Sequence, residues 1–197
     1  EALWRAARAR VMVGMSEKEI VDQNSWYDEA IRLGDRAVAL RPDGVEGLHW
    51  RGAALGRRAL NASAGYAAEL AQRVFEDANA ILALDPDHAG AHNLLGQLFV
   101  EVMSLSRIER FIGRMRYDND ALRESSWEAA EHHLQAAVDL APNTVQFQLD
   151  LAKLYERRGR EEEARQALEQ VLELAPVHPP DASLQRDAER LLEELGS

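Results

Sequence analysis

Four short phrases that end in proline divide the chain, and they constrain the fold more than any other feature. Each phrase has the apolar spacing of a helix and then a proline, which cannot continue a helix and restricts the residue before it. Each phrase is therefore predicted to end one helix and begin a turn, and such recurrence is typical of a repeat architecture. The phrases are residues 37–42 (AVALRP), 81–86 (ILALDP), 137–142 (AVDLAP) and 171–176 (VLELAP).

The last unit, residues 145–178, has the spacing of a tetratricopeptide repeat, which spans about 34 positions. Small residues are expected where paired helices cross closely, and large apolar residues beside them. Gly159 marks the turn between the two helices. The residues that carry the pattern are Leu151, Ala152 and Tyr155 on the first helix and Ala164, Leu168 and Val171 on the second.

The three earlier units align with the last one through their prolines. The third unit matches well, whereas the first two are degenerate but readable. The third has Leu95, Gly96 and Phe99 with Ala130, Leu134 and Ala137; the second has Gly52 and Leu55 with Val74, Ala78 and Ile81; the first has Trp4 and Val11 with Ala30, Gly34 and Ala37.

These units predict an all-α solenoid of about four helix pairs within a single domain, residues 1–197. The prolines are 44, 56 and 34 residues apart, so the two middle repeats exceed the last spacing by 10 and 22 residues. We expect the extra residues to lengthen helices, above all in 94–115, which has few helix breakers, with Ser125 and Ser126 beginning the next helix. The approximate repeats are 1–44, 45–88, 89–144 and 145–178, followed by a capping helix at 182–195 that covers the last repeat.

Composition excludes several classes of function. The formal net charge of -11 opposes binding to nucleic acid and to anionic membranes as general partners, although a local basic patch could escape this rule. The chain has no cysteine, and therefore no disulfide, thiolate zinc site or cysteine nucleophile. It has no apolar run long enough for a membrane span. We expect a soluble protein, cytoplasmic or periplasmic if bacterial, and the start at Glu1 leaves room for an upstream signal or anchor.

Four further phrases resemble the regulator of microtubule dynamics family of tetratricopeptide proteins. The resemblance covers nearly the whole chain and implies a non-enzymatic adaptor. Animal members are linked to microtubules, but this chain is acidic, as is the microtubule surface, so the resemblance extends to the fold and the adaptor role and not to tubulin binding. The phrases are residues 3–9 (LWRAARA), His49 and Trp50 followed by Gly52, residues 91–96 (AHNLLG) and residues 105–110 (LSRIER).

The first helices of such repeats line a concave groove, and in this family of folds the second, fifth and ninth positions of a repeat face it. The resulting set is polar and mixed in charge, so it is able to hydrogen-bond an extended or helical peptide, although a solvated groove without a ligand has the same composition. These candidate groove residues are Arg5, Glu46, His49, Asn93, Gln97, Gln146 and Lys153.

The longest insertion offers a second candidate surface. Arg107, Arg110 and Arg114 share one helical face, and a set of apolar residues shares another. A partner or an anionic surface could dock there, and a basic outer face above an ordinary packed face explains the pattern equally well. The apolar residues are Ile108, Phe111, Ile112 and Met115.

No catalytic, metal or cofactor site is predicted. The pairs His132 with His133 and His88 with His92 suggest metal binding, but adjacent histidines point to different sides of a helix and His88 lies in a turn. Phosphate loops, nucleophile elbows and dinucleotide fingerprints are absent from the sequence. We therefore expect a scaffold that binds a protein segment in its groove. The alternative is a structural subunit of a larger assembly, possibly at a membrane, docked through outer faces and inserted helices; an enzyme is the weakest hypothesis.

Overall fold

The computed structural model describes residues 1–117 and 119–196; the side chain of Arg114, one of the candidate surface residues, also lies outside the description. The described residues form eleven α-helices and no strand. The helices are α1 (Ala2–Ser16), α2 (Ile20–Leu40), α3 (Val45–Ala59), α4 (Ala64–Leu84), α5 (Ala89–Ser104), α6 (Arg107–Arg116), α7 (Asp120–Glu124), α8 (Trp127–Leu140), α9 (Val145–Arg157), α10 (Glu161–Glu173) and α11 (Asp181–Leu195).

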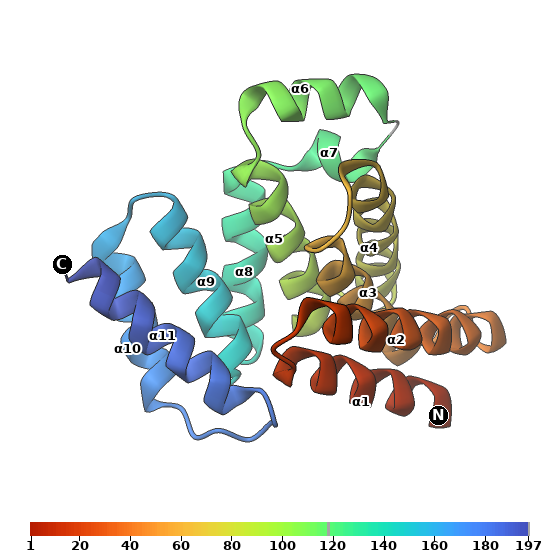
Figure 1. Cartoon of the computed structure of the whole chain (residues 1–197), viewed down its shortest axis with the longest axis horizontal. Coiled ribbons are helices and arrows are strands. Elements are labelled where there is room, and N and C mark those ends of the chain that lie inside the picture. Colours follow the sequence, from red (N-terminus) through yellow and green to blue (C-terminus); the bar gives the residue numbers. More distant parts are fainter. Residues whose placement is uncertain (118, 197) are drawn as a thin grey trace.

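The helices pack as pairs that follow one another along a curved stack (Figure 1). The pairs are α1 with α2, α3 with α4, α5 with α8, and α9 with α10, while α11 packs on α10 and α9. The predicted all-α solenoid with four helix pairs and a C-terminal capping helix is therefore confirmed.

The same tight turn connects each of the first three pairs to the next. In each turn a backbone N–H donates to the carbonyl three residues earlier: Gly44 to Arg41 at 3.0 Å, His88 to Asp85 at 3.2 Å, and Thr144 to Ala141 at 3.2 Å. The proline takes the second position of each turn, where its fixed backbone angle is favourable. The recurrent prolines thus set where one pair ends and the next begins.

The core consists of small and large residues in alternation along the helix crossings. Gly96 lets α5 approach α8 so closely that a Cβ on it would lie 2.5 Å from Cγ of Leu134. Ala130 and Ala137 of α8 are fully buried beside this contact. One apolar cluster runs from α1 to α9 and a second joins α9, α10 and α11; Met15 packs against both, which links the two ends of the stack.

The longest insertion differs from its prediction. Residues 94–115 do not form one long helix, because α5 ends at Ser104 and α6 begins at Arg107. A capping box separates them: the Ser106 hydroxyl accepts from the Glu109 N–H at 3.2 Å, and the Glu109 carboxylate accepts from the Ser106 N–H at 2.8 Å. Helices are lengthened elsewhere, since α4 has 21 residues where α9 and α10 have 13 each.

The insertion therefore adds two short helices, α6 and α7, beside the stack (Figure 1). The next helix, α8, begins at Trp127 as expected, because the Ser126 hydroxyl accepts a hydrogen bond from the Ala129 N–H at 3.0 Å. Among the residues that the structure describes, no helix is both long and apolar enough to cross a bilayer.

Candidate binding groove

The first helices of the four pairs, α1, α3, α5 and α9, line one concave groove with a volume of about 1230 Å³. Residues of α4, α6 and the segment leading into α11 complete its walls. First helices of successive repeats stack on one another, so a solenoid gathers their outward side chains on one continuous surface. The groove is therefore formed by residues from nearly the whole length of the sequence, from Trp4 to Leu184.

Six of the seven predicted groove residues line this cavity. Arg5 does not: it pairs with Glu1 at 3.5 Å and its guanidinium lies 5.3 Å from the centroid of the Trp4 ring. Arg8, almost one turn further along α1, lines the groove in its place, with its guanidinium 5.4 Å from the centroid of the Trp50 ring. The prediction at Arg5 is therefore almost one turn too early, because the degenerate first repeat has few residues that fix its alignment. The six are Glu46, His49, Asn93, Gln97, Gln146 and Lys153.

Three of these six, all amides, surround one carboxylate on the floor of the groove. Asp150 accepts hydrogen bonds from Asn93 at 3.0 Å, from Gln146 at 2.8 Å and from Gln97. Arg57 of α3 donates to the Gln146 side-chain oxygen at 3.0 Å, so the network joins α3, α5 and α9. Asn93 is only 5% exposed. The network holds the floor in shape, and much of its hydrogen-bonding capacity is used within the protein.

The walls of the groove consist of apolar side chains with charged side chains among them. Lys153 and Arg8 provide positive charge, while Arg157 is paired with Glu101 at 2.8 Å. An amphipathic segment could bury apolar side chains there and pair its charged groups with these residues. The largest apolar lining residues are Trp4, Met12, Met15, Trp50, Leu98, Ile112 and Phe147.

His49 is neutral in the groove. Its Nδ1 atom is buried and has no hydrogen-bond partner among the described residues. Burial, His88 and Arg8 together lower the pKa of His49 to about 3. Gly90 leaves room for the ring, because a Cβ there would lie 2.3 Å from Cε1 of His49. His49 therefore contributes an uncharged ring to the groove at neutral pH.

Three further histidines, His88, His92 and His133, make local hydrogen-bond contacts. The Nδ1 atoms of His92 and His133 lie 2.9 Å apart between α5 and α8, and the His88 Nδ1 accepts from the Ala91 N–H at 3.0 Å at the start of α5. Burial, His92 and His132 lower the pKa of His133 to about 4. Among the described residues, no three histidine or acidic side chains are gathered where they could hold a metal ion.

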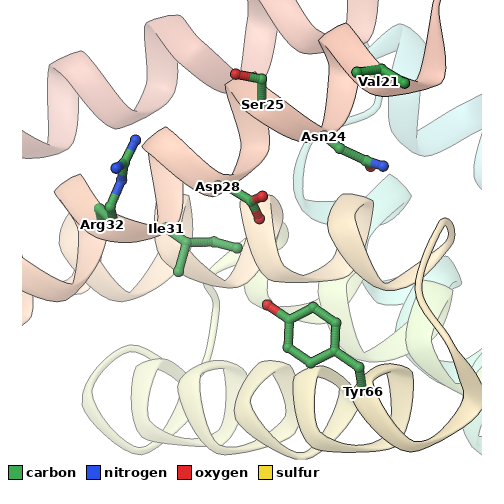
Figure 2. Close-up of a pocket in the computed structure, with 7 residues that line it drawn as sticks. All are labelled: Val21, Asn24, Ser25, Asp28, Ile31, Arg32 and Tyr66. Atoms are coloured by element: carbon green, nitrogen blue, oxygen red, sulfur yellow. The ribbon is translucent and has the colours of Figure 1, made fainter.

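A smaller hollow of about 610 Å³ lies between α2 and α4 (Figure 2). Asp28 of α2 faces Tyr66 of α4 across it, and Asn24, Ser25 and Arg32 stand along its edge (Figure 2). Asp28 is occupied by an ion pair with Arg58 at 3.0 Å. The hollow is formed mainly by one face of a single helix, α2, with Tyr66 as the one lining residue from α4.

Helix pairs stacked about a concave surface define a tetratricopeptide-repeat solenoid. The fold is similar to the crystal structure of TTC0263, a thermophilic TPR protein of Thermus thermophilus, with a TM-score of 0.56 and 20% identity over 95% of this chain and 83% of that one. A crystal structure of MamA matches with a TM-score of 0.47 and 18% identity over 91% of this chain and 94% of that one. No curated protein shows significant sequence similarity to the chain.

The family follows from the sequence as a whole. The model of the regulator of microtubule dynamics protein 1-3 family matches residues 1–196. The chain belongs to this family, as the phrases in its first, second and third repeats predicted.

Proposed function

We propose that this protein is a scaffold whose concave groove binds an amphipathic segment of a partner protein. The observation that carries the proposal is the groove itself, about 1230 Å³ in volume, continuous across the first helices of the four pairs and lined by apolar side chains with isolated charges. Binding sites combine apolar lining with a few placed polar groups in this way. A helix with its side chains is about 10–12 Å across, and an apolar face docked in a groove is a recurrent mode of peptide recognition.

The partner segment is expected to carry acidic residues beside its apolar face. Lys153 and Arg8 stand at the groove, while the Asp150 carboxylate already accepts three amide hydrogen bonds from Asn93, Gln97 and Gln146. The available positive groups favour a ligand with negative charge, and a buried aromatic or aliphatic side chain would supply most of the binding energy.

The test begins with affinity purification from the source cell and then measures the purified partner against variants. Ala53→Trp adds bulk inside the groove, and Arg8→Ala with Lys153→Ala removes two of its charges. Both should weaken binding at least tenfold, because hot-spot contacts are each worth about 1–2 kcal/mol or more. Asn93 and Gln97 are unsuitable targets, since their loss would leave the Asp150 carboxylate without its donors.

The matched control is Lys18→Ala with Arg36→Ala, which removes two exposed positive charges outside the groove. This variant should bind as the original protein does. If the groove variants keep full affinity while remaining folded, the groove proposal is wrong.

The alternative, a structural subunit of a larger assembly docked through inserted helices, is favoured by one specific observation. Phe111 and Met115 of α6 are 64% and 75% exposed, which leaves large apolar side chains in contact with water. An assembly of this kind would survive the groove substitutions and would be lost on substitution of α6.

A further inference from the structure

Helix α6 exposes its apolar side chains to solvent, and Ile112 at one edge of this apolar face also lines the groove. Ile108, Phe111, Ile112 and Met115 fall within one face of about 100° by helical spacing, and their exposed fractions run from 52% at Ile112 to 75% at Met115. A helix on the surface of a globular protein normally turns such a face toward the core. The sequence also allowed α6 to bury its apolar face under an exposed basic face, and these exposed fractions exclude that arrangement.

The opposite side of α6 contacts the protein and fixes this orientation. A Cβ at Gly113 would lie 3.3 Å from Cδ1 of Leu122 in α7, so the glycine side faces α7 closely. The Arg110 guanidinium donates to the Met103 carbonyl at 2.8 Å and to the Leu105 carbonyl, at the end of α5. Arg110 thus works as a C-terminal cap of α5 and not as an outer surface residue. Turning the apolar face inward would break these contacts.

The charge of α6 is opposite to that of the chain. The helix has four arginines and one acid, Glu109, whose carboxylate is bound to the Ser106 N–H at 2.8 Å, whereas the chain has a net charge of -11. Helical spacing places Arg107 on one side of the apolar face and Arg116 on the other, and both are exposed. Basic residues therefore border an apolar strip along both of its edges.

We propose that α6 docks flat on an anionic phospholipid surface. An apolar face bordered by arginines is typical of helices that lie in a membrane interface, where the apolar side chains enter the acyl boundary and the guanidinium groups stay at the headgroups. Figure 1 shows α6 at the outer edge of the molecule, where a flat surface can reach it. Salt screens charges over about 8 Å, so acidic residues farther than this from α6 oppose the contact only weakly.

A lipid surface fits these features better than the other occupants. Two copies that met through α6 would bring Arg107 and Arg116 of both molecules to the edges of one apolar contact, where like charges repel. A protein partner would need a groove shaped to a protruding helix, whereas a fluid bilayer adapts to it. This inference goes beyond the groove function and does not depend on it.

The test is sedimentation of the full chain with vesicles of phosphatidylcholine alone and of phosphatidylcholine with phosphatidylserine in equal parts. The protein should bind the vesicles with phosphatidylserine, and more weakly as salt is added. Ile108→Ser with Met115→Ser should weaken binding about tenfold or more, since each tenfold step corresponds to about one side chain partly buried. Leu40→Ser with Val177→Ser, a control at exposed apolar positions outside α6, should bind normally.

Arginine is tested separately. Arg107→Gln with Arg116→Gln should weaken binding to the anionic vesicles about fivefold for each arginine, and Arg36→Gln with Arg41→Gln should not. All of these sites are exposed, so the unfolding temperature serves as the check that each variant is folded.

Several results would overturn the proposal: no binding of the original protein to the anionic vesicles, equal binding to both kinds of vesicle, or full binding by the Ser variant. A dimer seen by light scattering that is lost in the α6 variants, without vesicle binding, would assign the face to a second copy. A purified protein partner lost in the same variants, again without vesicle binding, would assign it to that partner. Groove variants should keep vesicle binding, which separates this test from that of the proposed function.

Discussion

Arg51 and Asp77 form a buried ion pair between α3 and α4 whose removal should be costly. The Arg51 Nε donates to Asp77 Oδ2 at 2.9 Å and its Nη2 to Oδ1 at 2.5 Å, while Nη1 reaches Asp35 at 3.2 Å. Asp77 is only 2% exposed. Hydrogen bonding to Asp77 raises the pKa of Arg51, and burial raises the pKa of Asp77 against the opposite effect of Arg51. Each partner thus stabilises the charged form of the other.

Arg51→Met should leave the Asp77 carboxylate buried without its bidentate partner. Breaking a buried pair in this way costs about 3–5 kcal/mol, out of about 5–15 kcal/mol for a typical domain. At about 2–4 °C for each kcal/mol in a domain of this size, the melting temperature should fall by roughly 6–20 °C. Urea unfolding followed by circular dichroism and tryptophan fluorescence measures the loss directly.

Two matched variants make this prediction specific. Arg190→Met removes an arginine that is paired with Glu194 at 3.0 Å on the surface, and such exposed pairs contribute little to stability because solvent screens them. Arg51→Met with Asp77→Leu removes both buried charges and should recover most of the lost stability, because apolar replacement of a buried pair is often neutral. The reasoning fails if Arg51→Met alone costs less than about 1 kcal/mol, or if the double variant is no more stable than the single one.

Three further predictions follow from single residues. Gly96→Ala should lower stability by about 1–2 kcal/mol through its clash with Leu134, whereas Gly56→Ala, with its nearest neighbour 3.9 Å away, should raise it by up to about 1 kcal/mol; thermal unfolding separates the two signs. His49 binds its proton with a pKa of about 3 in the folded protein, against the ordinary histidine value of 6.5 that applies to the unfolded chain. Between pH 6.5 and about 3 the unfolded chain binds more protons than the folded protein, so the free energy of unfolding falls as the pH falls, by at most about 4–5 kcal/mol. His49→Gln should make the midpoint of urea unfolding less dependent on pH over this range. Gly159→Ala should cost about 1–2 kcal/mol, measured the same way, because φ is +69° there; an unchanged midpoint would contradict the strain argument.

The repeat architecture could be predicted from the sequence because its signals are local. A proline in a turn such as that of residues 41–44 ends a helix wherever it occurs, and Gly159 permits a backbone conformation that other residues avoid. The spacing of Gly96 and Leu134 likewise predicted which faces of α5 and α8 would meet. Such features depend on backbone chemistry and helical periodicity, and both can be recognised in the amino-acid sequence without a structure.

Local signals were also present where the prediction was wrong. The capping box of Ser106 and Glu109 ended the supposed long helix, and its Ser-x-x-Glu spacing was visible in the sequence. The apolar residues on either side favour a continuous helix when helical spacing alone is considered. The groove position in α1 was predicted at Arg5 and lies at Arg8, because a degenerate repeat provides few fixed points for alignment.

By itself, the sequence determined the helices, the turns and the pairing of their small and large residues. Only the tertiary structure decided which side of each helix meets a neighbour. Periodicity showed that α6 has an apolar and a basic face, but the contact of Gly113 with α7 and the bonds of Arg110 to the end of α5 turned the apolar face outward. The Asp150 network and the pair of Arg51 with Asp77 also depend on residues from separate helices, whose distances are set by how the pairs pack in three dimensions.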